Sequence, residues 1–444
     1  MKPAVHSTGH APSADELIHF GELEAQAMQH LAGSVQRPTR APFAWAEPLC
    51  TVGVTGTNGK SSTTHLLAHA IAAAGHSVLT ESTLGYWFND EELHVPRTSR
   101  GYLAALREAA ERGARHAVCE VTSAALARGF ARVWRYDLAV FTNLSRDHVE
   151  AHGSWEHYLA SKAQLFVHLG PGCSAVLNAC DPAAMLLDRV TPEDVKRRFF
   201  AVDSRGERLT VPDLAAAGVS LAAGGTRIAL EPSALADAFG GELTTTMIGA
   251  IFAENVLAAA LAALALNIPA ERVRAGIAEC PVVRGRFEVV SHAPLVAIDY
   301  AHTPDALART CDTARSLAPA GRVILVCGAG GDKDHEKREP MGRAVGERAD
   351  WALITSDNPR HEDPRQIAEA VARGARRGGR AHVQLELDRE RAIERALSGA
   401  RPNDVLVIAG KGHERGQLVA GVELPFSDHE CIARLIAGAR SQRA

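Results

Sequence analysis

The segment best suited to chemistry runs from Thr55 to Ser62 and reads TGTNGKSS. Glycines allow a backbone to wrap closely around phosphate, and amides at the start of a helix point toward it. Lys60 would neutralise the β- and γ-phosphates of a nucleotide, and the Ser61 hydroxyl would bind Mg²⁺. The strict pattern GxxxxGK[ST] is not met, because Val54 occupies the position of its first glycine. The candidate nucleotide-binding residues are Gly56, Thr57, Asn58, Gly59, Lys60, Ser61 and Ser62.

A second group of candidates follows two later apolar runs. Glu120 ends the run HAVCE, and an acid at the carboxyl end of a parallel strand faces the crevice where ligands bind. Its carboxylate could hold a second Mg²⁺, although strand-end acids are often only caps. Residues 141–166 contain Asn143, Asp147, His148 and Lys162. Taken alone, this histidine would more often be structural, and Lys162 could be a solvated helix lysine.

The elements that must position these residues alternate along the chain. We expect strands at 50–56, 76–82, 116–122 and 137–144, and helices at 60–74, 102–112 and 253–266. Residues 214–243 suggest two or three short strands, and further strands are expected at 295–301, 322–330, 351–358 and 404–412. This alternation predicts βαβ units and an α/β fold. It comprises a central phosphate-loop domain with a parallel sheet (47–283) and a doubly wound, Rossmann-like C-terminal domain (284–444). Residues 1–46 are expected to be a short segment and linker, with one amphipathic helix at 14–31.

Composition narrows the class of protein. The 444 residues are 46% hydrophobic and 23% charged with a net charge of -4, the balance of an ordinary globular protein. The chain has no large excess of basic residues, so no nucleic-acid or membrane partner is expected. The longest apolar run, Val256 to Leu266, is too short to span a bilayer. Eight scattered cysteines without a CxxC pair predict reduced thiols, and no signal pattern opens the chain, so a cytoplasmic location is expected.

The run from Phe141 to Phe166 also resembles a family motif. Its FTNLSRDH, followed by Tyr158 and Lys162, is similar to the TNL-x-x-DH and Y-x-x-x-K motifs of the Mur ligases. In that family the histidine helps to hold Mg²⁺, and CO₂ carbamylates the lysine so that it becomes a metal-binding anion. The resemblance therefore implies ATP, Mg²⁺ and a lysine carbamate as cofactors. It implies the metal ligands Ser61, Glu120, His148 and Lys162, and the catalytic residues Lys60, Glu120, His148 and Lys162.

The resemblance continues to about residue 428. Residues 249–255 (GAIFAEN) and 284–288 (RGRFE) are similar to family motifs in which Asn255 would contact the adenine and Arg286 the nucleotide. Residues 299–307 (DYAHTPDAL) would place Asp299 on the ribose. Residues 328–338 (GAGGDKDHEKR), 357–360 (DNPR) and 409–414 (AGKGHE) resemble the branch that adds meso-diaminopimelate. Arg360 could bind the far carboxylate of that amino acid with two parallel hydrogen bonds. The residues implied to receive its far amine and remaining polar groups are Asp357, Asn358, Gly410 and Glu414.

Four features depart from the family pattern. Only about 48 residues precede the phosphate-loop strand, so most of the domain that grips the UDP-sugar is expected to be missing. Ala124 replaces the histidine of EVSSH, and Lys333 replaces an arginine that contacts the amino acid. The acyl-binding TTP motif reads Thr98-Ser99-Arg100 after Arg97. The two arginines suggest a free carboxylate or phosphate on a smaller substrate, or are merely exposed.

Together these features predict an ATP-dependent acid–amino acid ligase that acts through an acyl phosphate and adds diaminopimelate or a similar amino acid. One alternative is a ligase for a small acid without UDP in specialised metabolism. Another is a catalytically silent nucleotide-binding module, which the intact Lys60, Glu120, His148 and Lys162 disfavour. The expected partners are a small-molecule acid and an amino acid. A homodimer or a partner protein would replace the missing domain.

Overall fold

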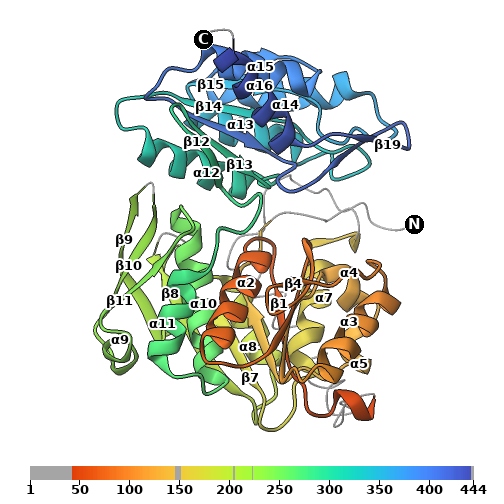
Figure 1. Ribbon diagram of the computed structural model, residues 1–444, viewed down its shortest axis with the longest axis vertical. Helices are drawn as coiled ribbons and strands as arrows, with labels where there is room; N and C mark the ends of the chain where they lie inside the picture. The colour runs from red at the N-terminus through yellow and green to blue at the C-terminus, as the bar shows by residue number, and fades with distance from the viewer. Residues whose placement is uncertain (1–42, 146–151, 204–205, 223, 442–444) are drawn as a thin grey trace, which may run out of the picture.

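A computed structural model describes residues 43–145, 152–203, 206–222 and 224–441. The helix expected at 14–31 and the candidates Asp147 and His148 lie outside these residues. The described chain forms two α/β units, one above the other in Figure 1, and each is built on its own sheet. The predicted fold class is therefore confirmed.

Within the described residues, the central unit contains an eleven-stranded sheet in the order β11-β10-β9-β8-β7-β6-β1-β5-β2-β3-β4. Its strands are β1 (Cys50–Thr55), β2 (Val78–Ser82), β3 (Gly85–Phe88), β4 (Glu91–Glu92), β5 (His116–Glu120), β6 (Leu138–Phe141), β7 (Ser174–Asn178), β8 (Lys196–Val202), β9 (Leu214–Ala222), β10 (Gly225–Leu230) and β11 (Glu242–Thr245). The strands from β2 to β9 in this order pair in parallel. Both edges are antiparallel, because short turns join β2 to β3 and β9 to β10.

Helices cover both faces of this sheet. A short 3₁₀ helix, η1 (Ala44–Ala46), precedes it. The remaining helices are α2 (Lys60–Ala73), α3 (Ser99–Glu111), α4 (Ser123–Ala127), α5 (Phe130–Val133), α7 (Trp155–Val167), α8 (Pro182–Val190), α9 (Ala234–Ala238), α10 (Ala250–Ala265) and α11 (Ala270–Glu279). The helices α2, α10 and α11 share one apolar core with the sheet, while α3, α7 and α8 share the core on the other face. The apolar run noted at Val256 to Leu266 is thus mostly a buried helix within a globular core.

The C-terminal unit has a six-stranded sheet, among the residues described, in the order β12-β13-β17-β14-β15-β16. Its strands are β12 (Glu288–His292), β13 (Leu295–Asp299), β14 (Val323–Cys327), β15 (Trp351–Ile354), β16 (His382–Leu385) and β17 (Val405–Ala409). Helices α12 (Pro304–Leu317), α13 (Arg338–Arg348) and α14 (Pro364–Gly378) cover one face, and α15 (Arg389–Gly399) and α16 (Asp428–Ser441) cover the other. A hairpin of β18 (Gly416–Val419) and β19 (Val422–Pro425) follows β17. This is the doubly wound arrangement predicted, with one antiparallel edge strand.

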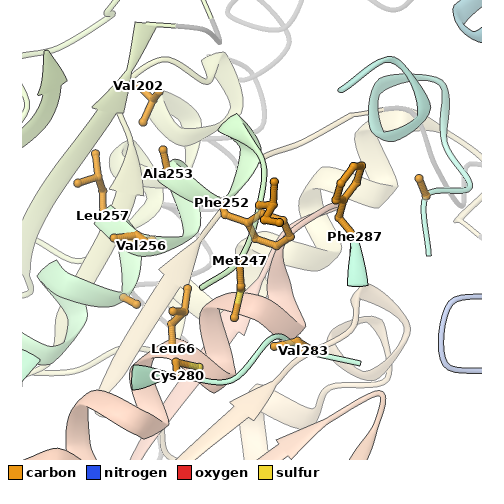
Figure 2. Close-up of a cluster of buried hydrophobic side chains, with 14 of the residues drawn as sticks. Leu66, Val202, Met247, Phe252, Ala253, Val256, Leu257, Cys280, Val283 and Phe287 are labelled. Carbon is orange, nitrogen blue, oxygen red and sulfur yellow. The ribbon is translucent and has the colours of Figure 1, made fainter. Parts of the chain in front are cut away.

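The two units share a continuous apolar core. Figure 2 shows Met247 and Phe252, at the start of α10, together with Leu66 of α2 and with Val283 and Phe287 of the connecting segment. All five side chains are buried. The connection between the sheets is therefore packed into the interior, and its position fixes where Arg286 enters the site described below.

The eight cysteines are free, and seven of them are buried, as their scattered positions predicted. Burial raises the pKa of several of these thiols, with that of Cys280 raised to about 12. Among the described residues, no helix combines the length and the apolar character needed to cross a lipid bilayer.

One buried ion pair ties α15 to α16. Arg389 donates from Nε and Nη2 to the two carboxylate oxygens of Asp428, each at 2.8 Å, and both side chains are fully buried. Replacing Asp428 with asparagine is expected to lower the free energy of unfolding by about 3–5 kcal/mol, because it leaves the Arg389 charge buried without its counterion. Urea unfolding measures this loss. The exposed pair of Arg434 and Glu390 is the control, and Arg434→Ala should change stability by less than about 1 kcal/mol. Equal effects of the two substitutions would contradict the prediction.

Candidate active site

The loop between β1 and α2 is braced by the end of β6. The backbone N–H of Thr57 donates to the carbonyl of Asn143 at 2.8 Å, and that of Asn58 donates to Asn143 Oδ1 at 3.0 Å. Thr142 Oγ1 in turn donates to the Asn58 carbonyl at 2.7 Å. The loop is thus held from outside and keeps a preformed shape at the N-terminus of α2, where amides favour phosphate.

Asn255 of α10 lies against this loop. A Cβ atom at Gly59 would lie 2.2 Å from Asn255 Oδ1, so only glycine fits there, and its φ of 85° is also one that glycine adopts readily. Asn255 Oδ1 is buried and has no hydrogen-bond partner among the described residues. A buried acceptor without a partner is costly, so a donor from a bound ligand would stabilise this position.

Lys60, Ser61 and Glu120 form the charged centre of the site. Ser61 Oγ donates to Glu120 Oε2 at 2.8 Å, and Lys60 Nζ lies 3.7 Å from Glu120 Oε1. The backbone N–H of Thr83 also donates to Glu120 Oε2, at 3.2 Å. Burial alone would raise the pKa of Glu120, but Lys60, the Ser61 hydroxyl and Arg286 together hold it below its ordinary value. Glu120 is therefore a carboxylate at neutral pH, beside the loop that would hold phosphate.

Arg286 enters the site from the connection between the two units. Its Nη2 donates to Ser61 Oγ at 3.0 Å, and its guanidinium lies 4.3 Å from the centre of the Tyr300 ring. Asp299, at the end of β13, accepts a hydrogen bond from Thr310 Oγ1 at 3.0 Å. Burial raises the pKa of Asp299 above its ordinary value. The connection thus brings the Arg286 cation to the phosphate loop, where it contacts the Tyr300 ring of the C-terminal unit. The C-terminal unit also supplies the acid Asp299, which lines the same cavity.

The side chain of Lys162, in α7, reaches the same loop. Its side chain is 1% exposed, its Nζ donates to the Gly56 carbonyl at 2.8 Å, and it lies 4.4 Å from the centre of the Tyr158 ring. The Tyr158 hydroxyl is 3.1 Å from Thr57 Oγ1. The expectation from the lysine alone, a solvated helix residue, is wrong, because α7 packs this face against the sheet.

A cavity of about 400 Å³ joins these groups, and its walls come from both units. Most of the predicted nucleotide and metal residues line it. They are Gly56, Thr57, Asn58, Gly59, Lys60, Ser61, Ser62, Glu120, Lys162, Asn255, Arg286 and Asp299. Lys333, predicted to contact the amino acid, lines it as well.

The residues predicted to bind the far end of an amino acid form a second cluster. Asn358 Nδ2 donates to Glu414 Oε2 at 2.9 Å, and Asp357 Oδ2 is buried without a hydrogen-bond partner among the residues described. Gly410 has a φ of 113°, and a Cβ there would lie 2.5 Å from Asp357 Oδ2, so only glycine leaves room for that oxygen. Arg360 Nη1 donates to the Gly331 carbonyl at 2.8 Å.

This cluster adjoins the cavity through the loop that follows β14. A Cβ atom at Gly330 would lie 2.9 Å from Arg360 Nη1 and 3.7 Å from Lys333 Cγ. Lys333 lines the cavity, so the loop from Gly330 to Lys333 connects the cavity with the Arg360 guanidinium. The structure thus brings the nucleotide residues and the amino-acid residues into two neighbouring sites.

The segment predicted to bind the acyl substrate makes hydrogen bonds within the central unit. Thr98 is the N-cap of α3, since its Oγ1 accepts from the Gly101 N–H at 3.1 Å, and it does not line the cavity. Arg97 donates to the carbonyls of Thr83 and Ser82 at 2.6 and 2.8 Å. The side chain of Ser99 is not among those described. Arg97 is thus held against the end of β2, and its binding of a substrate anion stays a prediction.

Sequence reasoning missed several cavity residues. His152 Nε2 lies 2.9 Å from Ser123 Oγ, next to Ala124, and its Nδ1 lies 3.2 Å from Ser161 Oγ. Burial and the nearby Lys162 lower the pKa of His152. Thr83 and Tyr300 also line the cavity. The motif DYAHTPDAL contains Tyr300 and could have pointed to it. No local pattern marks Thr83, which directly follows β2.

Comparison with known proteins identifies the family. The family model for the Mur ligase middle domain matches residues 54–263, and the model for the glutamate ligase domain of Mur ligases matches residues 285–412. The UDP-N-acetylmuramoyl-L-alanyl-D-glutamate–2,6-diaminopimelate ligase of Aquifex aeolicus is 36% identical over 409 residues, which covers 88% of this chain and 78% of the relative. The chain belongs to the Mur ligase family. It is accordingly an ATP-dependent ligase that forms amide bonds.

Other Mur ligases show the same relationship. The ligase of the same name from Chromobacterium violaceum is 38% identical over 388 residues, covering 86% of this chain and 76% of the relative. A solved structure of a ligase with that name superimposes with a TM-score of 0.60 at 28% identity, covering 99% of this chain and 86% of the other. The folylpolyglutamate synthase of Mycobacterium tuberculosis, at 22% identity and a TM-score of 0.63, covers 88% of this chain and 96% of its own and shares the fold.

Proposed function

We propose that this Mur ligase joins a carboxylic acid to meso-diaminopimelate, or to an amino acid of the same shape, through an acyl phosphate. The observation that carries the proposal is the buried Asp357 carboxylate, whose Oδ2 atom has no partner among the described residues and lies against Gly410, where only glycine leaves room for it. Glu414 adds a second carboxylate and Arg360 a guanidinium at the same place. An amino acid whose far end carries both an ammonium and a carboxylate matches this pattern of charges.

The phosphate end of the site fits ATP with a divalent cation. The oxygen atoms of Ser61 and Glu120 are ligands of the kind that Mg²⁺ prefers, and a carbamate on the buried Lys162 would add a second anion to that of Glu120. A bound Mg²⁺ would neutralise the charge of the transferring phosphoryl group. Lys60 and Arg286 add two fixed positive charges beside the loop. These residues would stabilise the negative charge that develops as the substrate carboxylate attacks the γ-phosphate.

The remaining residues would orient the substrates. Asn255 would offer its buried oxygen to a donor of the nucleotide, and Asp299 would accept from a ribose hydroxyl. Lys333 lines the cavity on the loop whose Gly330 lies against Arg360, and it would contact the amino acid whose amine must reach the acyl carbon. Packing of the two units around the cavity would exclude water that otherwise hydrolyses an acyl phosphate.

Phosphate release from ATP tests this proposal. UDP-N-acetylmuramoyl-L-Ala-D-Glu and meso-diaminopimelate are added singly and together with Mg²⁺, and the products are identified by mass spectrometry. The proposal expects release only with both substrates, together with an amide product that contains diaminopimelate. Release with diaminopimelate and a small acid lacking UDP would retain the amino acid and change the acyl substrate. Turnover with L-lysine in preference to diaminopimelate would contradict the assignment of Arg360.

A further inference from the structure

Lys411 is a buried cation beside the cluster that would bind the amino acid. It lies in the loop after β17, and its side chain is 0% exposed. Its Nζ donates to Asn358 Oδ1 at 3.0 Å and to Glu414 Oε2 at 2.9 Å. A lysine ammonium only donates hydrogen bonds, so both contacts require acceptors that face it. Lys411 therefore fixes two of the side chains that would bind the amino acid.

The contacts of Asn358 leave its amide only one orientation. Its Oδ1 accepts from Lys411 and also from the Leu418 N–H of β18 at 3.0 Å, while its Nδ2 donates to Glu414 Oε2 at 2.9 Å. Reversing the amide would place its NH₂ group against two donors and its oxygen against the Glu414 carboxylate. Lys411, Asn358 and Glu414 thus form a closed triangle of charge-assisted hydrogen bonds.

The triangle uses one oxygen of Glu414 and leaves the other for a ligand. Both Lys411 and Asn358 bind Oε2. Asp357 directly precedes Asn358 in the chain, and its Oδ2 atom is buried without a hydrogen-bond partner among the described residues. Gln417 Nε2 holds the Asp357 carbonyl at 2.7 Å, which ties this segment to the same hairpin. Two carboxylate oxygens on one braced frame could accept from a single ammonium group.

We infer that Lys411 is a positioning residue for the far amine of the amino-acid substrate. It holds Glu414 and Asn358 in place so that the Glu414 carboxylate can bind that amine together with Asp357. This inference rests on the proposed function, because it assumes an amino acid with a second amine. A different role for Lys411, simple neutralisation of Glu414, has the opposite consequence. Its removal would then leave more negative charge in the site and strengthen the binding of an ammonium.

Calorimetric titration of Lys411→Met separates these roles. The probes are meso-diaminopimelate and 2-aminopimelate, which lacks the far amine, each with a non-hydrolysable ATP analogue and Mg²⁺. We expect diaminopimelate to bind about tenfold more weakly, the loss typical of charge-assisted hydrogen bonds, and 2-aminopimelate to bind as it does to the unmodified chain. Adding Lys411→Met to Glu414→Gln should cost little more, because Lys411 acts through Glu414. Lys196→Met, on the exposed start of β8, is the control and should leave both affinities unchanged.

Three results would overturn the inference. They are tighter binding of diaminopimelate, equal losses for both probes, and full additivity of the two substitutions. Thermal unfolding shows whether the variant is folded. If the unmodified chain binds neither probe while it still binds the ATP analogue, the proposed amino acid is wrong. The crystal structure of Lys411→Met then decides the positioning role: loss of the contact between Asn358 and Glu414 supports it, and retention of that contact overturns it.

Discussion

Glu120→Gln is expected to lower ATP turnover by about two to three orders of magnitude, the loss typical of removing one electrostatic stabiliser of a transition state. Glutamine keeps the shape of the side chain but removes the charge that faces Lys60 and accepts from Ser61. Because the pKa of Glu120 is held below its ordinary value, the unmodified side chain is fully charged at neutral pH. The variant is therefore compared with the unmodified chain at pH 7 to 8, by a coupled assay for ADP.

The same carboxylate gives a stability prediction with a definite sign. A depressed pKa means that the charged form stabilises the folded chain above pH 4.5, the ordinary value, and that this contribution fades as the pH falls toward the pKa in the folded chain. The matched control for turnover is Glu91→Gln, since Glu91 is exposed, pairs with Arg112 and belongs to β4 at the edge of the sheet. Similar turnover in Glu120→Gln and Glu91→Gln would remove Glu120 from the catalytic set.

Lys162→Ala is expected to lower turnover by about a thousandfold, and acetate or propionate should restore part of it. The proposed carbamate on Lys162 would act as an anion near the metal, and a small carboxylate can enter the space left by the truncated side chain. Lys162 is nearly fully buried beside the Gly56 carbonyl, so the space left is enclosed. Turnover is measured over a range of carboxylate concentrations, with propylamine at matched ionic strength as the comparison.

The contrast between the two additives decides what Lys162 does. If its amine only braces the phosphate loop through Gly56, propylamine should restore turnover and acetate should not. In that case the affinity for ATP should also fall, as seen in direct binding of an ATP analogue. Restoration by carboxylates alone, with ATP affinity unchanged, supports the carbamate. Lys196→Ala, at an exposed position, should respond to neither additive.

Each half of the site is held in place by hydrogen bonds within its own unit. The phosphate loop is braced within the central unit by Thr142 and Asn143. The amino-acid cluster is braced within the C-terminal unit by Lys411 and the hairpin of β18 and β19. Between them lie Arg286, which reaches Ser61, and Asn58, which donates to Asp305 at 3.2 Å.

The sequence by itself determined the family and most of the nucleotide site. The segment TGTNGKSS identifies its own loop, because the phosphate-binding backbone and the start of α2 are made by consecutive residues. Strands such as β1, β14 and β17 were predictable because buried parallel strands are continuous apolar runs. The strands β7, β8, β12 and β16 were missed, along with β3, β4 and the hairpin of β18 and β19, whereas β9, β10 and β11 confirm the short strands expected at 214–243. The edge positions or mixed polarity of the missed strands give no continuous apolar signal, and β7, although buried, begins with Ser174 and ends with Asn178.

Only the tertiary structure decided which polar side chains meet around the cavity and which are held by contacts elsewhere in the fold. Thr98 and Arg97 lie in a stretch that resembles a substrate motif, yet one caps α3 and the other binds the carbonyls of Ser82 and Thr83. In the sequence, Lys411 is only one residue of the AGKGHE motif. In the fold it is fully buried against Asn358, which lies 53 positions earlier in the chain. The physical reason is the same in each case. The partner of a polar group is set by long-range packing, and a local pattern of residues does not contain that information.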